Sequence, residues 1–339
     1  MRKYKNIIIF GGSGYIAGYI LNYIAANTGA DKIYLADIKE PRREVWDSAV
    51  HNLFDAGLLE FALCDVRKEI VMEPVKFDLI FNLAAIHREP GHEPAEYFET
   101  NIKGAENVTH FAESKNCQSI VFTSSIAPYG HAHEPLDESS PVVPYSPYGS
   151  SKLVAEKIHE GWKNKNHNRK LIIVRPGVIY GPYEDGNVPR LKQALKKHCF
   201  CYVGNRDVQK AGGYVKELAR SMFWTLDLLN KSNKKFVLYN FSFKNPPTLE
   251  EYVIAVTNVL GVKRTVLNLP YPAILALSHV ISAFSKLINV NQPIHPKRIK
   301  KLKINNLIIP SFLIEHGYDY IYDLESSFAD WKKDVPSEW

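Results

Sequence analysis

A tyrosine and a lysine stand four residues apart in the stretch SPYGSSK, residues 146–152. Four residues is close to one helical turn, so Tyr148 and Lys152 would lie on the same helical face. A phenol ordinarily titrates at about pH 10, and an ammonium about 4 Å away favours its ionised form by roughly 4 kcal/mol at an effective dielectric of about 20. The pair therefore predicts an acid–base group that works near neutral pH. A solvated surface pair has the same spacing, so the rest of the chain must decide between the two interpretations.

A glycine-rich turn near the N-terminus predicts a dinucleotide site. In FGGSGYIAG, residues 10–18, Gly11, Gly14 and Ala17 follow an apolar run and open a helix. Small residues let the backbone approach a pyrophosphate at the helix N-terminus, where amides and the helix dipole favour anions. Asp37 follows the second strand, where a carboxylate binds the ribose hydroxyls and repels a 2′-phosphate, so NAD is favoured. NADP stays open because three cations follow: Lys39, Arg42 and Arg43.

Apolar runs alternate with amphipathic stretches through the first half of the chain, most clearly at 95–115 and 147–164. This alternation predicts an α/β fold with a doubly wound parallel sheet, the Rossmann arrangement. After Pro176 the rhythm breaks, and we expect a smaller C-terminal α/β domain that binds the substrate. The expected strands are 6–10, 32–36, 59–64, 77–83, 119–124, 170–175 and 235–241. The expected domains are 1–180 with 212–243 for NAD, and 181–211 with 244–339 for the substrate.

Composition and charge exclude several classes of protein. The 339 residues are 45% hydrophobic and 23% charged, which is typical of a soluble globular protein and excludes a disordered or fibrous one. The net charge of +6 is concentrated in LKQALKKHC, 191–199, and HPKRIKKLK, 295–303. No nucleic-acid motif accompanies these runs, so an anionic small substrate or a phospholipid surface is favoured. The four cysteines are scattered, and neither they nor the histidines have the spacing of a metal site.

Two segments bear on localisation. The N-terminal apolar run, residues 7–10, is too short for a signal peptide, so we expect a cytoplasmic protein. The apolar stretch at 269–288 is interrupted by serines and a histidine and is too polar to span a bilayer. A buried helix is the default interpretation, and a peripheral contact at the inner face of the membrane is the alternative.

Together these motifs resemble the extended short-chain dehydrogenases/reductases, the NAD-dependent epimerase/dehydratase group that includes UDP-galactose 4-epimerases. The resemblance covers nearly the whole chain. It rests on the glycine loop and on NLAA (82–85), ETNIKGAENV (99–108), FTSSIAPYG (122–130), SPYGSSKLVAE (146–156) and VRPGVIYGP (174–182).

The resemblance implies a role for each matching residue. Tyr148 is expected to be the catalytic acid/base, with Lys152 lowering its pKa and holding the nicotinamide ribose. Ser125 is expected to bind the reacting sugar oxygen, with Ser124 as the alternative. The family also implies a homodimer formed through the helices at 95–115 and 147–164. The implied NAD contacts are Gly11, Gly14, Tyr15, Ile16, Asp37, Asp65, Val66, Leu83, Ala84, Ala85, Asn101, Ser124, Tyr148, Lys152 and Pro176.

Two departures from the family pattern narrow the chemistry. Dehydratases of this group place an Asp-Glu pair directly after the serine, whereas this chain has Ile126 and Ala127, which move no proton. The Arg-Asp common before the Tyr-Val dipeptide of soluble sugar-nucleotide enzymes is absent from KAGGYV, 210–215. In this the chain is similar to epimerases that act on N-acetylglucosamine linked to undecaprenyl diphosphate. The expected substrate contacts are His87, Arg88, Ser125, Asn187 and Lys210.

The sequence therefore predicts an NAD-dependent sugar 4-epimerase of surface-polysaccharide biosynthesis, acting through a transient 4-keto sugar. Its substrate is expected to be a sugar joined through a diphosphate to a nucleotide or a polyprenol. A 4-keto-sugar reductase or dehydrogenase and a steroid-type hydroxy-dehydrogenase remain alternatives. A non-catalytic cofactor sensor or scaffold is disfavoured because both Tyr148 and Lys152 are present.

Overall fold

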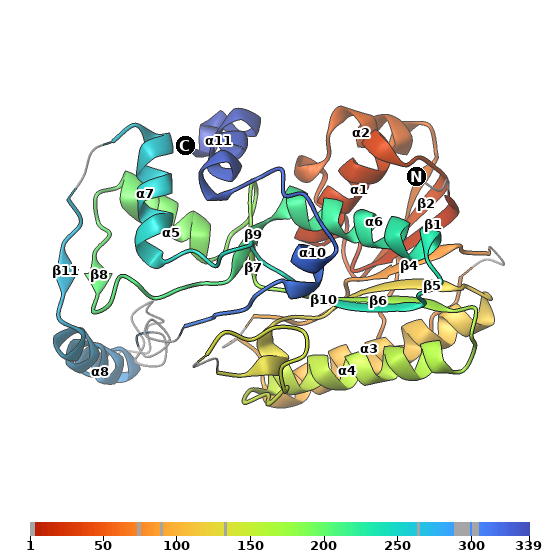
Figure 1. Cartoon of the computed structure of the whole chain (residues 1–339), viewed down its shortest axis with the longest axis horizontal. Helices are drawn as coiled ribbons and strands as arrows, with labels where there is room; N and C mark the ends of the chain where they lie inside the picture. Colours follow the sequence, from red (N-terminus) through yellow and green to blue (C-terminus); the bar gives the residue numbers. More distant parts are fainter. Residues whose placement is uncertain are drawn as a thin grey trace.

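The chain is built around a parallel sheet whose strands run in the order β10-β6-β5-β4-β1-β2-β3 (Figure 1). The strands are β1 (Tyr4–Phe10), β2 (Ala30–Asp37), β3 (Leu59–Leu63), β4 (Leu79–Asn82), β5 (Ser119–Thr123), β6 (Lys170–Pro176) and β10 (Phe236–Phe241). The computed structural model describes residues 4–72, 76–88, 91–131, 134–262, 265–287, 299 and 305–339. The chain order reverses at β1, which pairs with β2 on one side and β4 on the other. Ligands bind at the carboxyl ends of the strands beside such a switch point, and the predicted doubly wound fold is confirmed.

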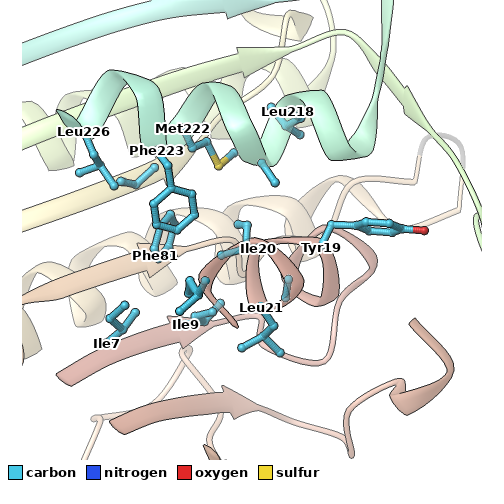
Figure 2. Packing of buried hydrophobic residues seen from close by; sticks show 14 of the residues in the cluster. Ile7, Ile9, Tyr19, Ile20, Leu21, Phe81, Leu218, Met222, Phe223 and Leu226 are labelled. Atoms are coloured by element: carbon cyan, nitrogen blue, oxygen red, sulfur yellow. The ribbon is translucent and has the colours of Figure 1, made fainter. Parts of the chain in front are cut away.

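Helices cover both faces of the sheet (Figure 1). On one face lie α1 (Tyr15–Asn27), α2 (Ser48–Asp55) and α6 (Val215–Lys231), and on the other lie α3 (Pro94–Ser114) and α4 (Pro147–Asn164). Figure 2 shows the first of these interfaces, where Ile20 of α1 and Phe223 of α6 pack over Ile9 and Phe81. Strands buried on both faces need apolar residues at successive positions, which is why the runs along the sequence are continuous.

A smaller lobe follows the sheet strands β6 and β10. It contains α5 (Asn187–Lys196), α7 (Leu249–Leu260), α8 (Tyr271–Leu287), α10 (Ser311–Glu315) and α11 (Leu324–Asp334), with the short parallel pairs β7 (Val178–Tyr180) with β9 (Gly212–Tyr214) and β8 (Tyr202–Val203) with β11 (Asn268–Leu269). Aromatic side chains dominate its core, where the rings of Tyr180 and Phe328 stack with centroids 5.0 Å apart. Leu313 and Tyr318 join the core of the large sheet instead. The exact domain boundaries stay a prediction.

The apolar segment at 269–288 forms α8 over residues 271–287. On this helix two apolar side chains are exposed, whereas a serine side chain is buried. Ser278 is fully buried, whereas the side chains of Leu277 and Val280 are 50% and 66% exposed. The default interpretation as a buried helix is therefore wrong for this face. Within the described residues, no helix combines the length and the apolar character that crossing a membrane requires. The basic run at 295–303, apart from Ile299, lies outside the described residues.

Candidate active site

The glycine loop lies where β1, β2 and β4 end. Gly11 has a φ of +73°, and a Cβ there would stand 2.7 Å from the backbone nitrogen of Ala84. Its N–H donates to the carbonyl of Ala36 at 2.9 Å. Gly14 is the N-cap of α1 and contributes no capping side chain, so the first amides of the helix remain open to an anion. The loop thus brings bare backbone to the site at which a pyrophosphate is expected.

Asp37 closes the ribose side of this loop. Its Oδ2 accepts the N–H of Ser13 at 3.0 Å, and its Oδ1 accepts the N–H of Ile38 at 2.7 Å. Two of the three nearby cations have other contacts: Arg42 pairs with Glu44 at 2.8 Å, and Arg43 stacks over two aromatic rings. These contacts support a ribose hydroxyl rather than a 2′-phosphate at Asp37.

The predicted adenine side follows β3. Val66 is 7% exposed and packs against α3, where a Cβ on Gly104 would come within 2.9 Å of it. Arg67 donates to both carboxylate oxygens of Asp65, at 2.9 and 2.7 Å, and its hydrogen bonds lower the pKa of Asp65. Arg67 thus holds the Asp65 carboxylate in place.

The predicted catalytic pair, Tyr148 and Lys152, lies at the start of α4. Ser146 caps the helix by accepting the N–H of Gly149 at 3.2 Å, and Tyr148 and Lys152 follow in the first turns. Lys152 is 2% exposed and donates to the carbonyl of Thr123, at the end of β5, at 2.7 Å. Burial lowers the pKa of Lys152 to about 7, and the charge of Glu156 acts in the opposite direction. The lysine therefore titrates close to neutral pH.

The two candidate serines have different surroundings. Ser124 is 4% exposed and donates its hydroxyl to Glu156 at 2.5 Å, so that hydroxyl is already engaged. Ser125 is half-buried, and its Oγ accepts the N–H of Ala127 at 3.1 Å, which leaves its proton available to a substrate oxygen. The turn after Ser125 packs on α4, because a Cβ on Gly149 would stand 2.7 Å from the carbonyl of Ala127. This favours Ser125 over Ser124 for the substrate contact.

Asn101 joins the loop after β4 to the catalytic helix. Its Oδ1 accepts the N–H of Ile86 at 2.9 Å, and its Nδ2 donates to the hydroxyl of Ser151 at 2.9 Å. That hydroxyl in turn donates to the carbonyl of Tyr148 at 2.8 Å. Asn101 thereby fixes the Leu83–Ala85 segment relative to the start of α4. On the other side of β5, the carbonyl of Pro176 accepts the N–H of Ile126 at 3.1 Å.

The predicted substrate contacts are only partly brought together. Partial loss of hydration and the charges of Arg88 and Lys152 lower the pKa of His87, so its imidazole is within electrostatic reach of the catalytic lysine. Arg88 pairs with Asp185 of the loop after β7 at 2.6 Å. Asn187 is the first residue of α5, and Gly186 holds the N-cap position. Lys210 precedes β9, and burial lowers its pKa to about 8.

Sequence reasoning missed the contacts of the loop after β7, residues 181–186. Tyr183 adopts a left-handed φ of +65°, and both of its backbone polar groups are held by distant side chains. Its carbonyl accepts from Arg42 at 2.9 Å, and its N–H donates to Glu338 at 3.0 Å. A Cβ on Gly181 would stand 2.8 Å from the hydroxyl of Tyr15, so the loop touches the first residue of α1. The positive φ of Tyr183, a residue other than glycine, is the local sign of this arrangement, and it cannot be seen in the sequence.

Comparison with known proteins identifies the family. Residues 7–239 match the NAD dependent epimerase/dehydratase family. The chain belongs to this family. As a member it is an enzyme of the extended short-chain dehydrogenase/reductase type that uses NAD, as the motifs predict.

Individual relatives agree with this placement. An N-acetyl-alpha-D-glucosaminyl-diphospho-ditrans,octacis-undecaprenol 4-epimerase from Escherichia coli O157:H7 is 28% identical over 298 residues, 87% of this chain and 85% of the relative. A UDP-glucose 4-epimerase from Lacticaseibacillus casei is 29% identical over 54% of each chain. The solved UDP-N-acetylglucosamine 4-epimerase from Methanobrevibacter ruminantium M1 has a TM-score of 0.76 at 21% identity and covers 100% of both chains. The UDP-Glc/GlcNAc 4-epimerase from Campylobacter jejuni has a TM-score of 0.73 at 19% identity, covering 98% of this chain and 100% of that one.

The residues present fit NAD. The bare backbone at Gly11, the uncapped start of α1 and the carboxylate of Asp37 suit a pyrophosphate and a ribose. Lys152 and Pro176 border the end where the nicotinamide is expected. Among the described residues, no group of histidines, cysteines and carboxylates is arranged to hold a metal ion.

Replacing two glycines one at a time distinguishes loss of the NAD site at Gly11 from the effect of backbone strain alone. Gly57 has a φ of +69° with open space around its Cβ position, so Gly57→Ala should cost about 1 kcal/mol of unfolding free energy and leave NAD bound. Gly11→Ala adds the clash with Ala84, and we expect a larger loss of stability together with loss of NAD. Urea unfolding and the NAD content of the purified proteins measure both effects. Equal behaviour of the two variants would contradict a cradle at Gly11.

Proposed function

We propose that the protein is an NAD-dependent 4-epimerase of a sugar attached through a diphosphate to its carrier. The observation that carries this proposal is the docking of the Tyr148–Lys152 helix against the turn that presents the Ser125 hydroxyl. Ile126 and Ala127 offer no second proton-transfer group beside it. Elimination of water needs such a group, whereas reversible oxidation of a hydroxyl does not.

The residues support a two-way proton transfer at one sugar oxygen. Tyr148 takes the hydroxyl proton as the sugar carbon is oxidised and returns it after the sugar has turned over. Ser125 donates a hydrogen bond to the same oxygen, and the ammonium of Lys152 stabilises the phenolate. NAD, when bound, supplies a reversible hydride acceptor.

A polyprenyl diphosphate is the carrier that we favour. The undecaprenol-linked relative aligns with 87% of the chain, whereas the UDP-glucose 4-epimerase relative aligns with 54%. The outward apolar face of α8, with Leu277 and Val280, offers a contact for an acyl chain or the membrane surface. The basic run that follows in the sequence suits an anionic headgroup, and together they suggest a peripheral site of action at the inner face of the membrane.

Isotope labelling tests the epimerase proposal. Substrate deuterated at the inverting carbon should give a 4-epimer that keeps its deuterium, because the hydride that leaves this carbon returns to it. Turnover should need no added NADH. Tyr148→Phe should lower kcat to below a few per cent of the wild-type value while NAD stays bound, since only the transferable proton is lost. Mass spectrometry and NMR of the products follow both. Loss of label to free NADH, or stoichiometric NADH consumption, would favour a reductase or dehydrogenase.

The carrier can be tested through α8. Leu277→Gln with Val280→Gln should raise KM for undecaprenyl-diphosphate-linked N-acetylglucosamine about tenfold, because partly buried lipid contacts are lost. Ile254→Gln with Ile321→Gln is the matched control, since these side chains are 50% and 59% exposed elsewhere. The KM values are measured in mixed micelles. Turnover of UDP-N-acetylglucosamine alone, with no effect of the α8 variant, would assign a nucleotide carrier.

We further propose a homodimer formed through α3 and α4, as the family resemblance implies. A groove runs between the two helices, and the side chains of Phe98 and Val154 are 38% and 41% exposed on them. Val154→Arg should convert the dimer to a monomer without unfolding it, because a charge would be buried between the copies. Light scattering at micromolar concentration measures the state, and a monomeric wild type would rule the dimer out.

A further inference from the structure

A buried carboxylate lies one helical turn beyond Lys152. Glu156 is fully buried in α4, and its two oxygens accept three hydrogen bonds. Oε1 accepts from the hydroxyl of Ser124 at 2.5 Å and from Nε of Arg175 at 2.9 Å. Oε2 accepts from Nη2 of Arg175 at 2.7 Å. Tyr148, Lys152 and Glu156 therefore follow one another at four-residue steps along the inner side of the helix.

Glu156 holds together the elements that form the catalytic turn. Ser124 ends β5 and donates its N–H to the carbonyl of Val174 in β6 at 2.7 Å. Arg175 is the next residue of β6, and its guanidinium lies 4.7 Å from the ring centre of Tyr129 in the turn after Ser125. One carboxylate thus joins the end of β5, the end of β6 and α4, while Ser125 is covalently next to its partner Ser124.

The pairing with Glu156 raises the pKa of Arg175. Burial acts to lower the pKa of Arg175, but the hydrogen bonds and charge of Glu156 outweigh it and raise that pKa. Bidentate pairing satisfies both groups in a site where either charge alone would be costly. Replacing either Glu156 or Arg175 alone would therefore leave the other charge buried without its partner.

The same carboxylate is the anion nearest to Lys152 along the helix. Burial lowers the pKa of Lys152, and Glu156 is the group that raises it again. His159 adds no positive charge at neutral pH, since burial lowers its pKa to about 4, against its hydrogen bond to Ala155. The titratable groups that act on Lys152, or on which its charge acts, are Glu156 and His159 of α4 and His87 after β4. Arg175 of β6 pairs with Glu156.

We propose that Glu156 is a positioning residue of the active site, which sets Ser125 against Tyr148 through Ser124 and places a buried carboxylate one helical turn from Lys152. Neither oxygen of Glu156 touches the substrate in this arrangement. The proposal rests on the proposed function for its kinetic readouts, but the charge on Lys152 can be measured without any substrate.

Two variants separate the two roles of Glu156. Ser124→Ala removes the bond to β5 and leaves the ion pair intact, so kcat should fall about tenfold, with KM and the pH profile unchanged. Glu156→Gln should lower kcat further and move the alkaline limb of the pH–rate profile to lower pH by about one unit, because Lys152 loses its proton more readily. Ser221→Ala, which removes a fully buried serine hydroxyl of α6 beneath the opposite face of the sheet, is the matched control and should keep wild-type kcat.

NMR titration of carbon-13-labelled lysine ε-carbons gives the readout that is independent of turnover. The Lys152 signal, assigned with Lys152→Met, should titrate at lower pH in Glu156→Gln than in the wild type. An unchanged Lys152 pKa with a uniform loss of rate across pH would overturn the electrostatic role. A Ser124→Ala kcat equal to that of Ser221→Ala would overturn the positional role, even if Glu156→Gln fails to fold. A wild type without epimerase activity would overturn the proposed function and leave the NMR result to decide on Glu156.

Discussion

The site depends on how α4 is fastened to the end of β5. Lys152 reaches inward to the carbonyl of Thr123, and one turn later Glu156 accepts from Ser124. Hydrogen bonds in a buried site fix direction as well as distance, which apolar packing alone does not. Sliding or rotation of the helix would break both contacts at once. The position of the Tyr148 phenol relative to Ser125 follows from this attachment.

The expected NAD site consists mainly of backbone and loops at the switch point of the sheet. Gly11 brings bare backbone against the Leu83–Ala84 peptide, and Asn101 holds the following loop to α4. The loop after β7 covers the start of α1, and Arg42 and Glu338 hold its strained Tyr183 from opposite ends of the chain. An epimerase must retain its reduced cofactor through the cycle, and a loop fixed on two sides is suited to this.

The smaller lobe carries an exposed apolar face on one of its helices. Its helix α8 buries serines and exposes leucine and valine, the reverse of what solvation by water would select. A lipid carrier would cover these side chains and gives the reversal a physical reason. In the turn after Ser125, the side chains of Ile126 and Ala127 cannot transfer a proton, so Tyr148 is the proposed proton carrier beside Ser125. The proposed carrier contact thus lies in the smaller lobe, whereas the proposed proton transfer lies at the start of α4 beside the large sheet.

The sequence by itself determined the parallel sheet, the glycine cradle and the Tyr148–Lys152 pair, because strand burial, tight turns and helical periodicity are properties of a few neighbouring residues. It did not show that the hydroxyl of Ser124 is engaged, since its partner Glu156 lies 32 positions away. Nor did it show the contact of Glu338 with Tyr183, 155 positions apart, or the outward apolar face of α8. Periodicity assigns a side chain to one side of its own element. Which element it meets there is set by packing between distant parts of the chain, and only the tertiary structure decided that.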